Sequence, residues 1–260
     1  MHELDGKVAI ITGGGYGIGK RITFAYAESG ARIALAARTA SALETTRAEL
    51  EKLGARAIAI TTDVSKEADC GRMAAQTLET FGRIDILVNN AGISGPTARA
   101  TEMTLAAWQE VLDINLTGAW LAARAVLPVM ERQGAGDIVN LSSFSGRRGV
   151  ALRTPYVASK WAMVGMTQAL AMEWGGRGIR VNCICPGAVA GDRIERVIRA
   201  ASEARHTSPE QVRRGLTSMS AMGRMVTEEE VARTALFLVS GLASGLTGQT
   251  INVDAGAAMN

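Results

Sequence analysis

The sequence predicts an α/β fold built around a doubly wound parallel sheet. Two observations lead to this fold class: short apolar runs recur along the 260 residues, and longer amphipathic stretches separate them. The apolar runs are nearly continuous rather than alternating, which is typical of strands covered on both faces. Strands that alternate with helices in this way indicate βαβ units.

Seven segments have the length and composition of buried strands. Each is six residues long, which is too short for a helix of a globular protein. They occupy residues 7–12, 32–37, 56–61, 84–89, 137–142, 179–184 and 250–255. We therefore expect about seven parallel strands with helices on both faces of the sheet.

The stretches between these strands have apolar residues at helical spacing. Residues 41–54 and 67–82 show the pattern, and both end in glycine, a common residue at helix C-termini. The chain has only five prolines, and no low-complexity linker divides it. We expect a single domain over residues 1–260.

Composition limits the classes of function. The net charge is +3, from 28 basic and 25 acidic residues that are interspersed, so no nucleic-acid partner is expected. The three cysteines, Cys70, Cys183 and Cys185, lack zinc-site spacing and indicate free thiols in a reducing compartment, with no metal. The sequence shows no secretory signal and no apolar window of the ~18 residues that a membrane span needs. These features predict a cytoplasmic protein without a membrane partner.

A glycine cluster, "TGGGYGIG" at residues 12–19, lies between the first predicted strand and the first predicted helix. In a doubly wound sheet this turn faces the crevice where ligands bind. Gly13, Gly17 and Gly19 lack a Cβ atom, so the backbone can approach a pyrophosphate closely at the helix N-terminus. The cluster favours a Rossmann-type dinucleotide site, although a tight turn that binds nothing would use the same glycines.

Later motifs resolve this ambiguity. Tyr156 and Lys160 are four residues apart and share one helix face, and Ser143 ends the fifth predicted strand. "NNAG" at 89–92 ends the fourth strand, and "PG" at 186–187 follows the sixth. In this order and spacing, the motifs resemble those of the classical short-chain dehydrogenase/reductase family over residues 5 to 257.

Transfer of a hydride between an alcohol and a ketone requires a group that gives or takes a proton near neutral pH. A tyrosine has an ordinary pKa of ~10, which a neighbouring ammonium and a positively charged nicotinamide would lower. We expect Tyr156 to be this acid/base. The resemblance implies that Lys160 also binds the nicotinamide ribose and that Ser143 orients the substrate oxygen. It further implies that Asn115 helps to hold a water that connects Lys160 to solvent.

The resemblance also implies a cofactor site. Ala37 occupies the position where the family's NAD-selecting aspartate usually falls, and Arg38 follows it, which predicts NADP(H) rather than NAD(H). The expected cofactor-binding residues are Gly13, Gly15, Tyr16, Gly17, Ile18, Gly19, Arg38, Thr39, Asp63, Val64, Asn90, Ala91, Gly92, Tyr156, Lys160, Pro186, Gly187 and Val189.

Residues 188–223 correspond in position to the family's substrate lid, but they form a longer segment than in compact members. "SPEQ" at 208–211 predicts a helix start within it. The length suggests a substrate larger than a simple ketone, and an oligomer contact is the alternative. Arg147, Arg148 and Arg153 precede Tyr156 and could receive a carboxylate, phosphate or sulfonate; the alternative is a solvated cluster.

We therefore expect an enzyme that interconverts a secondary alcohol and a ketone with NADP(H). The alternatives are a 3-oxoacyl thioester reductase and a polyol or sugar dehydrogenase that uses NAD. A cofactor-binding regulator without turnover is the alternative from another class. By resemblance, a homotetramer should form through helices around 110–133 and 156–176.

Overall fold

The computed structural model describes residues 3–259, which form a seven-stranded parallel sheet in the order β3-β2-β1-β4-β5-β6-β7. The register places Val8 beside Arg32 on one side of β1 and Ala9 beside Ile86 on the other. The strands are β1 (Val8–Thr12), β2 (Arg32–Ala37), β3 (Ala57–Thr61), β4 (Ile86–Asn89), β5 (Gly136–Leu141), β6 (Ile179–Pro186) and β7 (Thr250–Val253). The predicted number and direction of the strands are confirmed.

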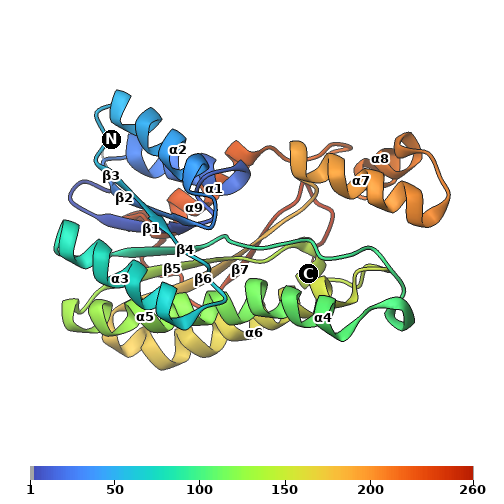
Figure 1. The fold of residues 1–260 in the computed structure, drawn as a ribbon. Coiled ribbons are helices and arrows are strands. Elements are labelled where there is room, and N and C mark those ends of the chain that lie inside the picture. The colour runs from blue at the N-terminus through green and yellow to red at the C-terminus, as the bar shows by residue number, and fades with distance from the viewer. Residues whose placement is uncertain (1–2, 260) are drawn as a thin grey trace.

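Helices cover both faces of the sheet, as predicted (Figure 1). One layer consists of α1 (Gly17–Glu28), α2 (Ala40–Lys52) and α9 (Glu228–Val239). The other layer consists of α3 (Glu67–Phe81), α4 (Leu105–Leu112), α5 (Gly118–Gln133) and α6 (Thr154–Trp174). No helix within residues 3–259 is long and apolar enough to cross a bilayer.

Each face of the sheet has its own apolar core. Ile10 and Leu87 belong to the cluster that includes Met130 of α5, whereas Ile11 belongs to the cluster that includes Tyr26 of α1. This two-sided burial explains why the strands are almost uniformly apolar. The strand order reverses between β1 and β4, and ligands of open α/β sheets bind beyond the carboxyl ends of the strands at such a point.

The 188–223 segment contains α7 (Asp192–Arg205) and α8 (Pro209–Ser218), which stand apart from the two helical layers at one end of the sheet (Figure 1). They pack around a small cluster of their own, formed by Ile198, Ala201 and Val212. Ser208 and Gln211 form a reciprocal capping box at the start of α8, which confirms the predicted helix start.

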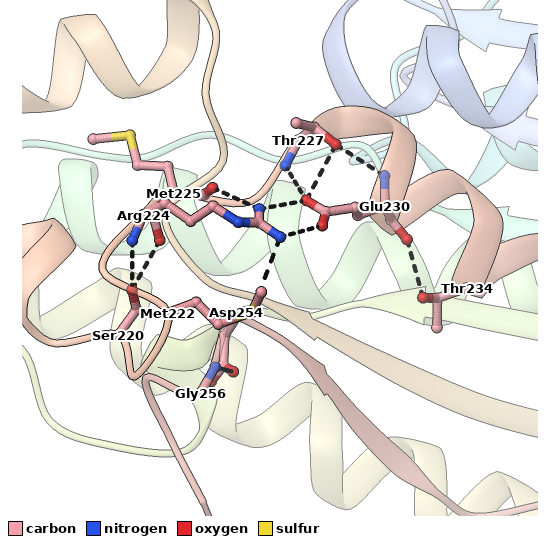
Figure 2. A network of polar contacts seen from close by, with 9 residues as sticks. All are labelled: Ser220, Met222, Arg224, Met225, Thr227, Glu230, Thr234, Asp254 and Gly256. Carbon is pink, nitrogen blue, oxygen red and sulfur yellow. Dashed lines mark hydrogen bonds and ion pairs between the residues drawn. The ribbon is translucent and has the colours of Figure 1, made fainter.

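Glycines lie near both ends of this segment, and ordered contacts follow the second one. Gly191 and Gly223 have φ angles of 144° and 64°, which favour glycine. Beyond Gly223, Arg224 forms an ion pair with Glu230 at 2.7 Å, and Glu230 also accepts a hydrogen bond from the Thr227 backbone N–H at 2.8 Å (Figure 2). These contacts fix the chain to the first turn of α9 just after the segment ends.

Candidate functional site

The glycine turn after β1 is tied to the end of β4 by the hydroxyl of Thr12. This hydroxyl donates to the carbonyl of Val88 at 3.1 Å and accepts from the backbone N–H groups of Asn90 at 3.0 Å and Ala91 at 3.1 Å. The amide of Asn90 donates in return to the carbonyls of Thr12 at 2.9 Å and Gly13 at 3.2 Å. The two motifs therefore form one rigid unit.

Only glycine fits at two positions of this turn. A Cβ atom on Gly19 would lie 2.3 Å from the carbonyl oxygen of Gly13, and one on Gly13 would lie 2.7 Å from the Asn90 amide nitrogen. Helix α1 then begins at Gly17 without any side-chain cap, so its first N–H groups are available to a ligand. A turn with free N–H groups at a helix N-terminus suits a pyrophosphate.

A cavity of about 1400 Å³ runs from this turn past the carboxyl ends of the strands to α6 and α7. Most of the predicted site residues line it together. They are Gly13, Tyr16, Gly17, Ile18, Asn90, Ala91, Gly92, Ser143, Tyr156, Lys160, Pro186, Gly187 and Val189. One continuous cavity thus joins the predicted cofactor residues to the predicted catalytic ones, which fits a dinucleotide and a substrate bound end to end.

The other predicted residues lie outside this cavity. Arg38 and Asp63 line a second cavity of about 400 Å³, together with Lys66. Gly15 packs close to Ala42. Val64 packs against Gly118, so that a Cβ atom on Gly118 would lie only 2.7 Å from Cγ2 of Val64. Gly19, Thr39 and Asn115 do not line the main cavity either.

Tyr156 and Lys160 lie one turn apart near the start of α6, with the ammonium 5.8 Å from the centre of the phenol ring. Lys160 is buried, and its Nζ donates to the carbonyl of Leu141 at 2.7 Å. The hydroxyl of Ser142 donates to the carbonyl of Lys160 at 2.7 Å, which ties α6 to the end of β5. The position of the ammonium is therefore set by the sheet.

Asn115 contacts α6 next to Tyr156 and Lys160, through the hydroxyl of Ser159. It lies in a π-helical turn, Asp113–Thr117, between α4 and α5, a deviation that is frequent at functional sites. Its amide accepts from the Ile93 backbone N–H at 2.8 Å and donates to the Ile93 carbonyl at 3.0 Å and to the Ser159 hydroxyl at 3.1 Å. Its side chain therefore connects the loop after Gly92 to α6.

The electrostatic surroundings of Tyr156 favour the phenolate. Burial by itself would raise the pKa of the phenol, but the positive charges of Arg193 and Lys160 lower it. A hydrogen bond with Ser143 and the charge of Arg153 add to the lowering, so the net pKa of Tyr156 lies below its usual value of 10.0. Burial also lowers the pKa of Lys160, and the Tyr156 phenolate opposes that shift. The tyrosine is thus prepared for proton exchange closer to neutrality.

Several cavity-lining cations were not identified from the sequence. Of the three predicted loop arginines, Arg148 and Arg153 line the cavity and Arg147 does not. Helix α7 adds three more, namely Arg193, Arg196 and Arg205. The three-residue spacing of Arg193, Arg196 and Arg199 is visible in the sequence and would have indicated a basic helix face, but not the direction in which that face points.

Comparisons with known proteins agree with this site. A family model described as enoyl-(acyl carrier protein) reductase matches residues 13–258. Galactitol 2-dehydrogenase (L-tagatose-forming) from Cereibacter sphaeroides is 40% identical over 258 residues, covering 98% of this chain and 96% of the relative. The 3-oxoacyl-(acyl-carrier-protein) reductase of Synechocystis sp. is 35% identical over 261 residues, covering 100% of both chains. NAD+-bound xylitol dehydrogenase superposes with a TM-score of 0.95 at 30% identity, over 97% of this chain and 99% of that chain.

These matches span nearly the whole chain and agree with the doubly wound sheet and its continuous cavity, which together define a nicotinamide-dependent oxidoreductase. The chain belongs to the classical short-chain dehydrogenase/reductase family. It is an NAD(P)-dependent enzyme that acts on CH–OH groups.

Proposed function

We propose that this enzyme interconverts a secondary alcohol and a ketone, with Tyr156 as the acid/base. The observation that carries the proposal is the lowered pKa of Tyr156 beside a buried ammonium and a serine, at the inner end of the cavity. In the oxidation direction the phenolate takes the hydroxyl proton of the alcohol, and in the reduction direction the phenol returns it.

The other catalytic residues act around that proton. Ser143 binds the reacting oxygen and holds it toward Tyr156, while Lys160 stabilises the phenolate and holds the nicotinamide ribose. The bound nicotinamide supplies or accepts the hydride. Asn115 is a positioning residue, because its side chain is fully engaged with Ile93 and Ser159, and it supports the water path from Lys160 to solvent.

The residues that line the main cavity would hold the cofactor, and the uncapped N-terminus of α1 would bind its pyrophosphate. Arg38 lines the second cavity, at the expected adenosine end, and an arginine there in place of an acidic residue favours the 2′-phosphate of NADP(H). Lys66 lines the same cavity, together with the carboxyl groups of Asp63, Glu110 and Asp113. Asp63 lines the same second cavity, whereas Thr39 and Val64, which were also expected to bind the cofactor, line neither cavity. The NAD+ in the xylitol dehydrogenase structure makes NAD(H) the alternative to test.

The 188–223 segment is proposed to be the substrate lid, because residues of α7 and α8 line the same cavity as Tyr156. A 3-oxoacyl thioester or a polyol remains an alternative substrate, since relatives named for both reactions match the whole chain.

We also propose a homotetramer formed through α5 and α6. Trp120 is 44% exposed, Trp161 is 50% exposed and Met172 is 86% exposed on these helices, as expected for surfaces that a partner covers. The free thiols of Cys70, Cys183 and Cys185 support a cytoplasmic location.

The test of the proposed reaction is Tyr156→Phe, measured as turnover of a ketone panel with NADPH and, in parallel, NADH. We expect a loss of at least ~100-fold in kcat with unchanged cofactor binding, because the variant lacks only the proton-exchanging hydroxyl. Lower KM for NADPH than for NADH would support the cofactor assignment.

Tyr26→Phe is the matched control, since it removes the same atom where the hydroxyl donates to the Ala235 carbonyl at 2.9 Å in the core. It should lower stability by ~1 kcal/mol and leave turnover intact. Near-normal turnover of Tyr156→Phe would contradict the acid/base assignment, and cofactor binding without turnover of any ketone by the unmodified protein would favour a regulator.

A further inference from the structure

Arg153 is a buried cation that forms no ion pair with a carboxylate of residues 3–259 and lies over the ring of Tyr156. Its side chain lines the cavity, yet the residue is only 9% exposed. Among the described residues its one hydrogen bond is long, from Nη1 to the Thr97 hydroxyl at 3.4 Å. None of the ion pairs formed within residues 3–259 includes it. Charged groups that are buried are normally paired, and within residues 3–259 the Arg153 guanidinium has the Tyr156 ring and the Thr97 hydroxyl as partners but no carboxylate, so it can accept an anion that is not part of the chain.

A second arginine approaches the same loop from the opposite side of the cavity. Arg193, in the first turn of α7, extends its Nη1 to within 3.4 Å of the Gly92 carbonyl. It too is absent from every ion pair in the described part of the chain. Arg153 and Arg193 therefore contact one short loop, Gly92 to Thr97, from the sheet side and from the 188–223 segment.

The two guanidinium groups repel each other. Burial lowers the pKa of Arg153, and the charge of Arg193 lowers it further against the opposing effect of Tyr156. Two like charges that converge in one cavity are unfavourable until an anion lies between them. A carboxylate is planar and accepts two parallel N–H donors, and guanidinium groups match this geometry.

We propose that the substrate is a short oxo acid or hydroxy acid, whose carboxylate is bound between Arg153 and Arg193. This inference rests on the proposed function, because it uses Tyr156 to locate the reacting oxygen. The Arg153 guanidinium carbon lies 5.0 Å from the centre of the Tyr156 ring. The carboxylate must therefore lie only a few bonds from the carbon that is oxidised or reduced, as in a 2- or 3-oxo acid.

This substrate class differs from both alternatives above. A 3-oxoacyl thioester is uncharged beside its ketone, and a polyol has no charge at all. Neither would neutralise Arg153 and Arg193, so each would leave the buried Arg153 without a carboxylate partner.

The test compares 3-oxobutanoate with its methyl ester, which differ in charge and little in shape. For both compounds kcat/KM is measured with NADPH and NADH, and binding is measured by calorimetry with the cofactor present. The wild type should favour the acid by at least ~10-fold. Arg193→Gln and Arg153→Gln should each reduce that ratio by at least ~10-fold, as expected for loss of a charge-assisted contact.

Arg199→Gln is the matched control, because Arg199 lies on the same helix and does not line the cavity. It should keep the wild-type ratio. Arg193 is exposed, so its replacement keeps the test valid even if Arg153→Gln fails to fold. A wild type that neither reduces nor binds the acid in preference to the ester overturns the proposal, and so does an unchanged ratio in Arg193→Gln.

The outcomes separate the two proposals. The protein could bind the acid in preference to the ester, lose that preference in Arg193→Gln, and turn over no ketone. This result would support the anion site and contradict the proposed function. Turnover of neutral ketones, without preference for the acid, would support the proposed function and contradict the anion site.

Discussion

The two sides of the cavity are built in opposite ways. On the sheet side, Lys160 and Asn115 are buried and hydrogen-bonded to backbone groups of β5 and of the Gly92 loop. On the other side, the 188–223 segment has a core of its own centred on Ile198, and its cavity-lining Arg193 has no acidic partner within the described residues. The positions of Lys160 and Asn115 are therefore fixed by contacts within the chain, whereas Arg193 forms no ion pair within residues 3–259.

This difference suggests which part of the structure determines proton exchange and which determines selectivity. Proton exchange needs positions fixed within fractions of an ångström, and the sheet provides them. Selectivity needs a surface that closes on one ligand, and we propose that the 188–223 segment, with glycines at 191 and 223, provides it. Three changes test this division, starting with the largest expected effect.

Lys160→Met removes the buried ammonium but keeps a side chain of similar length. We expect kcat to fall by at least ~100-fold, because the phenolate of Tyr156 loses a buried positive charge that lowers its pKa. Steady-state turnover and cofactor titration measure the effect. Lys52→Met, at the exposed end of α2, is the control. A fall in kcat of less than ~10-fold would show that proton exchange does not depend on the fixed position of Lys160 on the sheet side.

The substitutions Ile198→Ala and Ile10→Ala each shorten a buried isoleucine to alanine, one in the 188–223 segment and one in the sheet core. Ile198 is 1% exposed in the small cluster of the 188–223 segment, and Ile10 is 0% exposed in the sheet core. We expect Ile198→Ala to lower kcat/KM by ~10-fold with little change in Tm, since the segment has its own packing. Ile10→Ala should instead lower Tm by ~10 °C. Equal changes in Tm would show that the two sides unfold as one unit.

Arg193→Gln should move the pH dependence of alcohol oxidation by the smallest amount, ~0.5 unit. The direction follows from charge: Arg193 lowers the pKa of Tyr156, so its removal raises that pKa, and the phenolate then forms at higher pH. The acidic limb of kcat/KM should shift upward. An uncharged alcohol, methyl 3-hydroxybutanoate, keeps carboxylate binding out of the measurement, and an unshifted limb would exclude Arg193 from the field at Tyr156.

Most of the sheet side is predictable from the sequence. Continuous apolar runs located the seven strands, and the resemblance to the family predicted that Ser143, Tyr156 and Lys160 share one site, where all three line the main cavity. The ends of strands were less predictable, because they depend on the partner strand. Strand β6 continues to Pro186, since Cys185 and Pro186 align with Asn252 and Val253 of β7.

The other side of the cavity was less predictable for a physical reason. Arg193 reaches the Gly92 carbonyl across 101 positions of the chain, and no local pattern encodes such a contact. The loop arginines illustrate the same limit. Arg148 and Arg153 line the cavity while Arg147 does not, because the direction of each side chain depends on the short turn between β5 and α6.

The hydroxyl of Thr12 has one more consequence. It accepts from two consecutive N–H groups after β4 and donates back to the same strand, so the glycine turn is ordered by contacts within the chain. The entropy lost in ordering that turn belongs to the free energy of folding and not to that of cofactor association. The nicotinamide dinucleotide therefore meets a preformed receptor, and its affinity reflects contacts rather than local folding.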